Sequence, residues 1–212
     1  MKTFKQFILE GSEPNIIELI KRDCSKFLKE SKLKRFFKES LLQPVYRGLE
    51  PPTYQVTKLA ASTDDENIHW FEGTVRTDRK PLSTKQEHHE IVDNLLKQQF
   101  GWNVRSAGLF CSGSIDTAGF YGKVHMIFPI GDYEFVWSKK YSDLYGEVMA
   151  VYNLDIEEAE RLINALIANG KYTNRNLVEA IKSKHEISFK CDRYYAVRNT
   201  DISAEFFGAL EK

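Results

Sequence analysis

Two stretches of alternating apolar residues, each interrupted by a short polar turn, constrain the fold of this chain most strongly. One covers residues 123–137 and turns at Gly131 and Asp132, and the other covers residues 185–197 and turns within 190–193. Apolar runs of this length on both sides of a polar turn are typical of antiparallel β-hairpins. The chain is therefore expected to contain an antiparallel sheet.

Helical segments separate these strands. Apolar residues recur every three or four positions near residues 14–28, 84–100, 155–169 and 174–183. Strands are expected near residues 44–49, 70–75, 104–111, 123–137 and 186–198. Separate runs of helices and antiparallel strands predict an α+β fold.

Composition narrows the class of protein. The 212 residues include 30 Lys and Arg against 30 Asp and Glu, so no overall field attracts nucleic acid or a membrane. No apolar run approaches the roughly 20 residues needed to cross a bilayer. Cys24, Cys111 and Cys191 are widely spaced, which favours reduced, buried thiols, and the His-Glu pairs at 89–90 and 185–186 lack the second histidine of a zinc-protease helix. We expect an intracellular, cytoplasmic protein without a metal.

The stretch from Gly108 to Tyr121 carries the first candidate site. Its Leu-Phe-Cys segment predicts the end of a buried strand, and Ser112, Gly113 and Ser114 place two hydroxyls and an unhindered backbone where that strand emerges. A small ligand could approach closely there. The alternative is an ordinary turn in which Ser114 or Asp116 caps a short helix.

Arginines and one glutamate supply the other candidates. Arg47 lies in a short apolar strand, where a guanidinium favours a carboxylate or phosphate partner, and Gly48 after it would let a ligand come near the backbone. The alternative for Arg47 is an internal ion pair. Arg76 and Arg79, in a basic turn, could help to hold a phosphate, and Glu186 opens the second apolar stretch.

In this order the three segments resemble the motifs of the Arg–Ser–Glu class of mono-ADP-ribosyltransferases, a family that includes bacterial toxins and enzymes of some bacterial viruses. The family's aromatic-Arg-Gly motif matches residues 46–48, and its Phe-x-Ser-Thr-Ser motif matches residues 110–114 with Gly113 in place of Thr. Its third motif, a Glu that opens a strand followed by a turn and aromatic-x-Val, matches residues 186–189 and 195–197. The resemblance covers about residues 44–198.

The resemblance implies an ADP-ribosyltransferase-like fold, in which two small sheets surround an NAD cleft and N-terminal helices pack alongside. Residues 1–43 would be the helical segment and residues 44–200 the catalytic domain, with a helical insertion at about 144–183. Residues 201–212 would be a C-terminal tail.

The implied activity is transfer of ADP-ribose from NAD to a macromolecular acceptor, with release of nicotinamide. The implied catalytic residues are Arg47, Ser112 and Glu186, and the implied NAD-binding residues are Arg47, Gly48, Ser112, Gly113, Ser114 and Tyr121. Phe120 or Tyr121 could stack on the nicotinamide, and Glu147 is a rival for the catalytic carboxylate. Two alternative functions stay open: an NAD glycohydrolase, and an inactive binding or structural protein on the same fold.

Two features bear on the acceptor. Lys184 stands where the family often has Glu or Gln, which indicates a target other than an exposed arginine. The segment from Lys21 to Lys38 is rich in Lys and Arg and could dock an acidic protein or a nucleic acid. A viral enzyme of this kind would act in the host cytoplasm, with no membrane partner.

Overall fold

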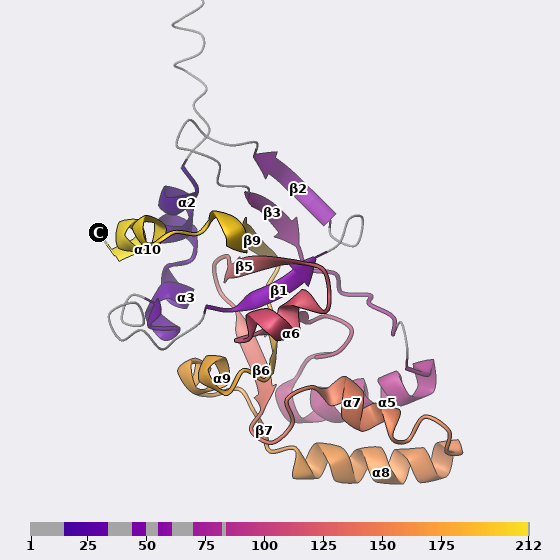
Figure 1. The fold of residues 1–212 in the computed structure, drawn as a ribbon. Coiled ribbons are helices and arrows are strands. Elements are labelled where there is room, and N and C mark those ends of the chain that lie inside the picture. The colour runs from indigo at the N-terminus through magenta and orange to yellow at the C-terminus, as the bar shows by residue number, and fades with distance from the viewer. Residues whose placement is uncertain (1–14, 34–43, 50–54, 61–69, 82–83, 212) are drawn as a thin grey trace, which may run out of the picture.

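The computed structural model describes residues 15–33, 44–49, 55–60, 70–81 and 84–211, which form an antiparallel sheet with helices on its two faces (Figure 1). The strands are β1 (Tyr46–Leu49), β2 (Gln55–Ala60), β3 (Trp70–Thr74), β4 (Leu109–Ser112), β5 (Lys123–Pro129), β6 (Glu134–Ser138), β7 (Tyr172–Thr173), β8 (Glu186–Lys190) and β9 (Arg193–Arg198). The helices are α2 (Ile16–Asp23), α3 (Ser25–Glu30), α5 (Gln86–Phe100), α6 (Ile115–Gly119), α7 (Leu144–Met149), α8 (Ile156–Asn169), α9 (Leu177–Ser183) and α10 (Ala204–Glu211). The predicted α+β class is confirmed.

The sheet has two parts that meet at one residue pair. Its order is β2-β3-β9-β5-β1-β4-β8-β6-β7, and the only pair between β1 and β4 joins Tyr46 to Ser112. In Figure 1, β1 and β5 run across the direction of β6. The structure therefore has one hydrogen-bonded sheet in place of the two small sheets that we expected.

Both predicted hairpins are wrong in their pairing, although their strands form. β5 pairs with β1 and β9, whereas β6 pairs with β7 and β8; likewise β8 pairs with β4 and β6, whereas β9 pairs with β3 and β5. Each predicted turn is a corner at which the chain passes between the two parts of the sheet. The N–H of Ile130 donates to the Arg193 carbonyl at 3.0 Å, and the N–H of Gly131 donates to the Asp23 carbonyl at 2.8 Å. These bonds fix the first corner against the second corner and α2.

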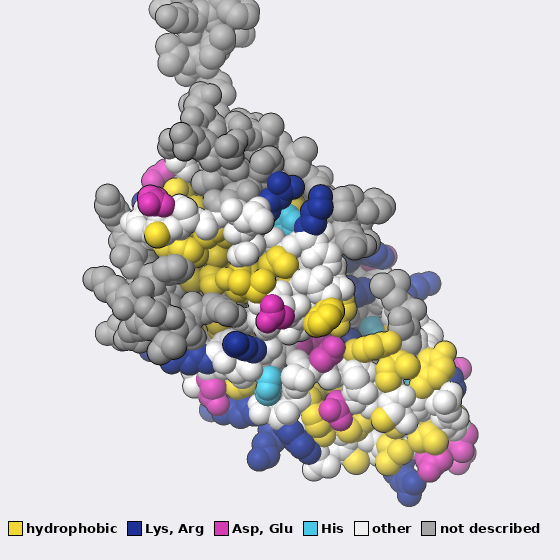
Figure 2. All heavy atoms as spheres, in the orientation of Figure 1, with side chains coloured by type: hydrophobic (Ala, Val, Ile, Leu, Met, Phe, Trp, Pro, Cys, Tyr) yellow, Lys and Arg dark blue, Asp and Glu magenta, His cyan; other side chains and the backbone are white. Residues whose placement is uncertain are grey.

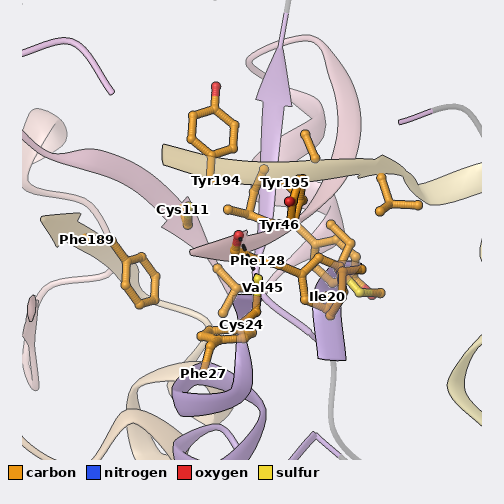
Figure 3. Packing of buried hydrophobic residues seen from close by; sticks show 14 of the residues in the cluster. Ile20, Cys24, Phe27, Val45, Tyr46, Cys111, Phe128, Phe189, Tyr194 and Tyr195 are labelled. Carbon is orange, nitrogen blue, oxygen red and sulfur yellow. Dashed lines mark hydrogen bonds between the residues drawn. The ribbon is translucent and has the colours of Figure 1, made fainter. Parts of the chain in front are cut away.

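The main core joins the N- and C-terminal helices to the sheet. The ring of Phe27 on α3 lies 6.1 Å from that of Phe128 and 6.2 Å from that of Phe189, and the Cys24 thiol donates to the Phe128 carbonyl (Figure 3). The expected long helix breaks at Cys24 into α2 and α3. The expected C-terminal tail contains α10, which buries Phe206, Phe207 and Leu210 in the same core.

A second apolar cluster lies on the other face of the β4–β8–β6 part. It combines buried residues of α5, α7 and α8 with Trp102, Val104 and Val136. Because side chains alternate along a strand, Ile187 and Phe189 of β8 face the main core, while Glu186 and Ser188 face the second cluster. The face on which Glu186 lies is thus covered by α7 and α8, from the expected helical insertion, together with α5, whereas α9 packs into the main core.

Candidate functional site

The three sequence motifs lie side by side, because β1, β4 and β8 are neighbours in the sheet. Tyr46 of β1 is paired with Ser112 of β4, and Ser112 is paired with Glu186 of β8. Arg47 follows Tyr46 directly in β1. Segments far apart in sequence are thus brought to one point, where the two parts of the sheet meet.

The side chain of Arg47 is only partly satisfied. Its Nη1 donates to the Phe110 carbonyl at 2.6 Å, and its Nε is buried without a hydrogen-bond partner. Among the described residues it has no ion-pair partner, so the expected alternative of an internal ion pair is not found there. A half-buried arginine whose Nε is an unused donor is suited to an anion from outside the chain.

Two further arginines lie over the ring of Phe110. The guanidinium carbon of Arg79 is 4.7 Å from the ring centre, and that of Arg105 is 4.4 Å from it. Burial, followed by the positive charges of Arg47 and Arg105, lowers the pKa of Arg79 to about 9, although the charge of Glu186 opposes this shift. A pKa lowered in this way indicates a cation whose desolvation and like-charge repulsion outweigh the nearby negative charge.

Arg105 was missed at the sequence level because residues 104–111 were expected to form a strand. The strand begins only at Leu109, and residues 101–108 form turns that carry Arg105 over the site. The Nη1 of Arg105 donates to Glu186 Oε1 at 2.8 Å. The only signal in the sequence is that Arg105 closely follows Gly101, at which the preceding helix was expected to end.

A buried carboxylate, Asp93 on α5, holds this loop in place. Asp93 Oδ1 accepts from the Arg105 N–H at 2.7 Å, and Oδ2 accepts from the Ser106 hydroxyl at 2.6 Å. The Ser106 carbonyl accepts from the Arg79 N–H at 3.1 Å, so one short segment positions both arginines.

His89 completes this network without making a hydrolase triad. Its Nε2 lies 3.1 Å from the Ser106 hydroxyl, whose proton is donated to Asp93. A serine nucleophile must instead donate its proton to the histidine, which an acid orients from its other nitrogen. We therefore assign these three residues a structural role.

Glu186 is held from two sides. Its N–H donates to the Ser142 carbonyl at 2.8 Å, and its carboxylate is bound by Arg105. Burial raises the pKa of Glu186; the charges of Arg105 and Arg79 oppose this, and that of Asp143 adds to it. The side chain is still 27% exposed and therefore accessible from solvent.

A small cavity lies beside the Glu186 side chain. Its lining includes Arg105, Tyr141, Tyr172 and Ser188. The buried Tyr172 hydroxyl has no hydrogen-bond partner. Apolar side chains, among them Leu96, Val104 and Leu144, form the rest of the lining, so the space beside Glu186 is mixed in character and has an unused donor from Tyr172.

Ser112 and Ser114 organise the backbone of the site. The Ser112 hydroxyl donates to the Lys184 carbonyl at 2.9 Å and accepts from the Ser114 N–H at 3.1 Å. The Ser114 hydroxyl accepts from the Thr117 N–H at 3.2 Å and caps α6. The capping alternative is confirmed for Ser114, while Ser112 fixes the segment that leads into Glu186.

Gly48 and Gly113 are packed against protein backbone, which differs from the expected role of admitting a ligand. A Cβ on Gly48 would lie 2.1 Å from the Ala118 carbonyl oxygen, and a Cβ on Gly113 would lie 2.0 Å from the Ile181 carbonyl oxygen. The space beside each glycine is therefore filled by α6 or α9. Both glycines are needed for close packing of these helices on the strands.

Three predicted residues remain to be placed: Phe120, Tyr121 and Glu147. Tyr121 is 59% exposed and its hydroxyl donates to Asp143 Oδ2 at 3.2 Å, while Phe120 is 87% exposed. Glu147 lies on α7, whereas Glu186 is in register with Ser112. The geometry therefore favours Glu186 over Glu147 as the third motif residue.

The basic N-terminal segment packs on the main-core face, away from Glu186. Lys21, Arg22 and Lys26 are paired with Glu18, Asp23 and Asp132 of the same chain. Lys34, Arg35 and Lys38, which belong to the same predicted docking segment, lie outside the described residues.

The described residues contain no cluster of three or more His, Cys, Asp or Glu side chains that could hold a metal ion. In the same part of the chain, none of the helices is long and apolar enough to cross a membrane. Cys24, Cys111 and Cys191 are buried, free thiols.

No protein-family model, curated protein or solved structure matches this chain.

Proposed function

We propose that this chain transfers ADP-ribose from NAD to a macromolecular acceptor and releases nicotinamide. The carrying observation is the pairing of Tyr46 with Ser112 and of Ser112 with Glu186, which sets Arg47 and Glu186 around one serine. The residues that the motif resemblance names are thus neighbours in the sheet. The resemblance was drawn from the order of the motifs alone, so the strand register supports it independently.

The arginines provide a place for the diphosphate of NAD. Among the described residues, Glu186 is the only carboxylate in an ion pair with Arg47, Arg79 or Arg105. A diphosphate carries a negative charge on each phosphate, and guanidinium forks bind phosphate oxygens in pairs. NAD bound there would supply the charge that Arg47 and Arg79 lack.

Glu186 would then act on the ribose next to the nicotinamide. The bond between ribose C1′ and the nicotinamide nitrogen breaks, and its electron pair stays on nicotinamide, which leaves neutral. The positive charge that develops on the sugar is stabilised by a fixed carboxylate, as in glycoside cleavage. A nucleophile of the acceptor forms the new bond to C1′ and loses its proton.

The ADP-ribosyltransferase-like fold is part of the same proposal. In this proposal the two parts of the sheet, which are joined at Tyr46 and Ser112, would take the place of the two small sheets of the ADP-ribosyltransferase-like fold. The arginine cluster and Glu186 lie where these parts meet, which is where an NAD cleft is expected.

The test is to incubate the protein with NAD that is labelled in its adenosine part, together with a cell extract. We expect both nicotinamide release and transfer of label to macromolecules. Nicotinamide release without transfer would instead identify an NAD glycohydrolase, and the absence of both would contradict an enzymatic function.

Arg79→Met separates the anion site from catalysis. Because Arg79 is a desolvated cation without an ion-pair partner in the described residues, its removal should raise the melting temperature of the free protein by about 2–4 °C. Pyrophosphate should raise the melting temperature of the wild type but not of this variant. Thermal unfolding with and without pyrophosphate measures both effects.

Arg161→Met is the matched control, because Arg161 lies on the exposed side of α8, where it is paired with Glu158 at 3.7 Å. Its melting temperature and its response to pyrophosphate should equal those of the wild type. An equal pyrophosphate effect in Arg79→Met would show that the anion binds elsewhere.

A further inference from the structure

An exposed apolar surface lies beside Glu186 and extends from the predicted NAD-binding residue Tyr121 along α7. We call it the α6–α7 surface, and it consists of Phe120, Tyr121, Tyr145, Met149, Tyr152 and Ile156, which are all exposed. Figure 2 shows hydrophobic side chains gathered over the end of α6 and along α7 and α8, with acidic side chains among them. Grouped aromatic side chains of this kind are typical of protein-binding surfaces.

This surface is directly connected to the catalytic carboxylate. Asp143 accepts from the Tyr121 hydroxyl through Oδ2 and caps α7 by accepting from the Tyr145 N–H through Oδ1 at 2.8 Å. The preceding residue, Ser142, accepts from the Glu186 N–H. A macromolecule bound on this surface would therefore lie next to the group that is proposed to act on NAD.

One segment of the surface carries charges of a single sign. Residues 141–160 contain the acidic residues Asp143, Glu147, Asp155, Glu157, Glu158 and Glu160 and no Lys, Arg or His. Asp116 on α6 adds to them. The cations that flank this segment include Lys85, which lies 5.4 Å from the ring of Tyr152, and Arg161, which is paired with Glu158. Lys123 and Lys140 are also exposed and lie close to Tyr121 and Asp143 in the sequence. In a chain of zero net charge, such a segment favours a basic partner.

We propose that the α6–α7 surface docks a basic protein, which is the acceptor of ADP-ribose. The acceptor role rests on the proposed function, whereas the basic character follows from the charges of the surface alone. This differs from the acidic target expected from the Lys21–Lys38 segment. In that segment Lys21, Arg22 and Lys26 are paired within the chain, and its helices α2 and α3 pack on the other face of the sheet.

Binding is tested without NAD, so that it does not depend on catalysis. The probes are fluorescent random copolymers of lysine with tyrosine and of glutamate with tyrosine, and binding is measured by fluorescence anisotropy at low salt. We expect the full chain to bind the lysine copolymer in preference to the glutamate copolymer. The double variant Tyr145→Ser/Met149→Lys should weaken that binding about tenfold, because the two positions share one face of α7.

Ala204→Lys is the charge-matched control, because Ala204 is exposed at the start of α10, beside α2 and away from α7 (Figure 1). It should bind the lysine copolymer as the wild type does. Circular dichroism should show that both variants fold, and nicotinamide release from NAD should stay within about twofold of the wild type in both. If no variant releases nicotinamide, the proposed function fails while the binding result still stands.

Three results would overturn the proposal. One is preferential binding of the glutamate copolymer, and another is an equal loss of binding in the control variant. The third is a wild-type dimer in sedimentation that the double variant dissociates, since the surface would then belong to a second copy of this chain.

Discussion

Glu186→Gln should reduce NAD cleavage by about a hundredfold or more, while NAD still binds. The substitution keeps the shape of the side chain but removes the negative charge that is proposed to stabilise the developing cation. Nicotinamide release at saturating NAD measures the catalytic effect, and equilibrium binding of NAD shows whether the arginine cluster remains functional.

Glu147→Gln is the control, because Glu147 lies on α7 and outside the strand register of the site. It should retain wild-type cleavage. Loss of activity in Glu147→Gln alone would show that the catalytic carboxylate had been assigned incorrectly.

The same carboxylate should set the acidic limb of the pH profile. Since burial raises the pKa of Glu186, the carboxylate takes up a proton at a higher pH than an ordinary glutamate does. Cleavage by the wild type should therefore decline, as pH falls, at a pH above the ordinary glutamate range. In Glu186→Gln this limb should be absent from the residual activity.

Gly113→Ala and Gly48→Ala should each destabilise the protein by about 2–3 kcal/mol, which corresponds to a fall in melting temperature of about 5–10 °C. Each new Cβ would overlap a backbone carbonyl oxygen, that of Ile181 or that of Ala118. A helix backbone cannot give way as the end of a flexible side chain can. Thermal unfolding of the free protein measures the effect.

Gly146→Ala is the matched control, because a Cβ at this position on α7 meets no atom within 4 Å. It should raise stability by about 0.5–1 kcal/mol, since alanine loses less backbone entropy than glycine in a helix. If Gly48→Ala and Gly113→Ala kept wild-type stability but bound NAD poorly, the two glycines would line the ligand site as the motif resemblance implied.

The glycines and serines show which features of the site local sequence can predict and which depend on tertiary packing. The sequence offered capping by Ser114 or Asp116 as an alternative, because a cap depends on residues only three positions away, and Ser114 is the cap. It could not indicate that Gly113 faces Ile181 of α9, since that contact joins distant segments. The motif resemblance assigned both glycines to the ligand, and the structure assigns them to helix packing.

The strands show the same division. Alternation of apolar residues identified β5, β6, β8 and β9, because alternation is a property of each strand alone. It did not identify their partners. A short turn would pair each strand with the next strand along the chain. Both faces of these strands are buried, and burial by helices on each face decides the pairing instead.

By itself, the sequence determined the α+β class, most of the helices and strands, and the order of the three segments that contain Arg47, Ser112 and Glu186. Only the tertiary structure decided that these segments are neighbours in register and that Arg105 and Arg79 converge on Phe110 beside Glu186. The physical reason is that periodicity and capping act over a few residues. The electrostatics of a site depend on which charges are brought together and removed from water by packing across the whole chain.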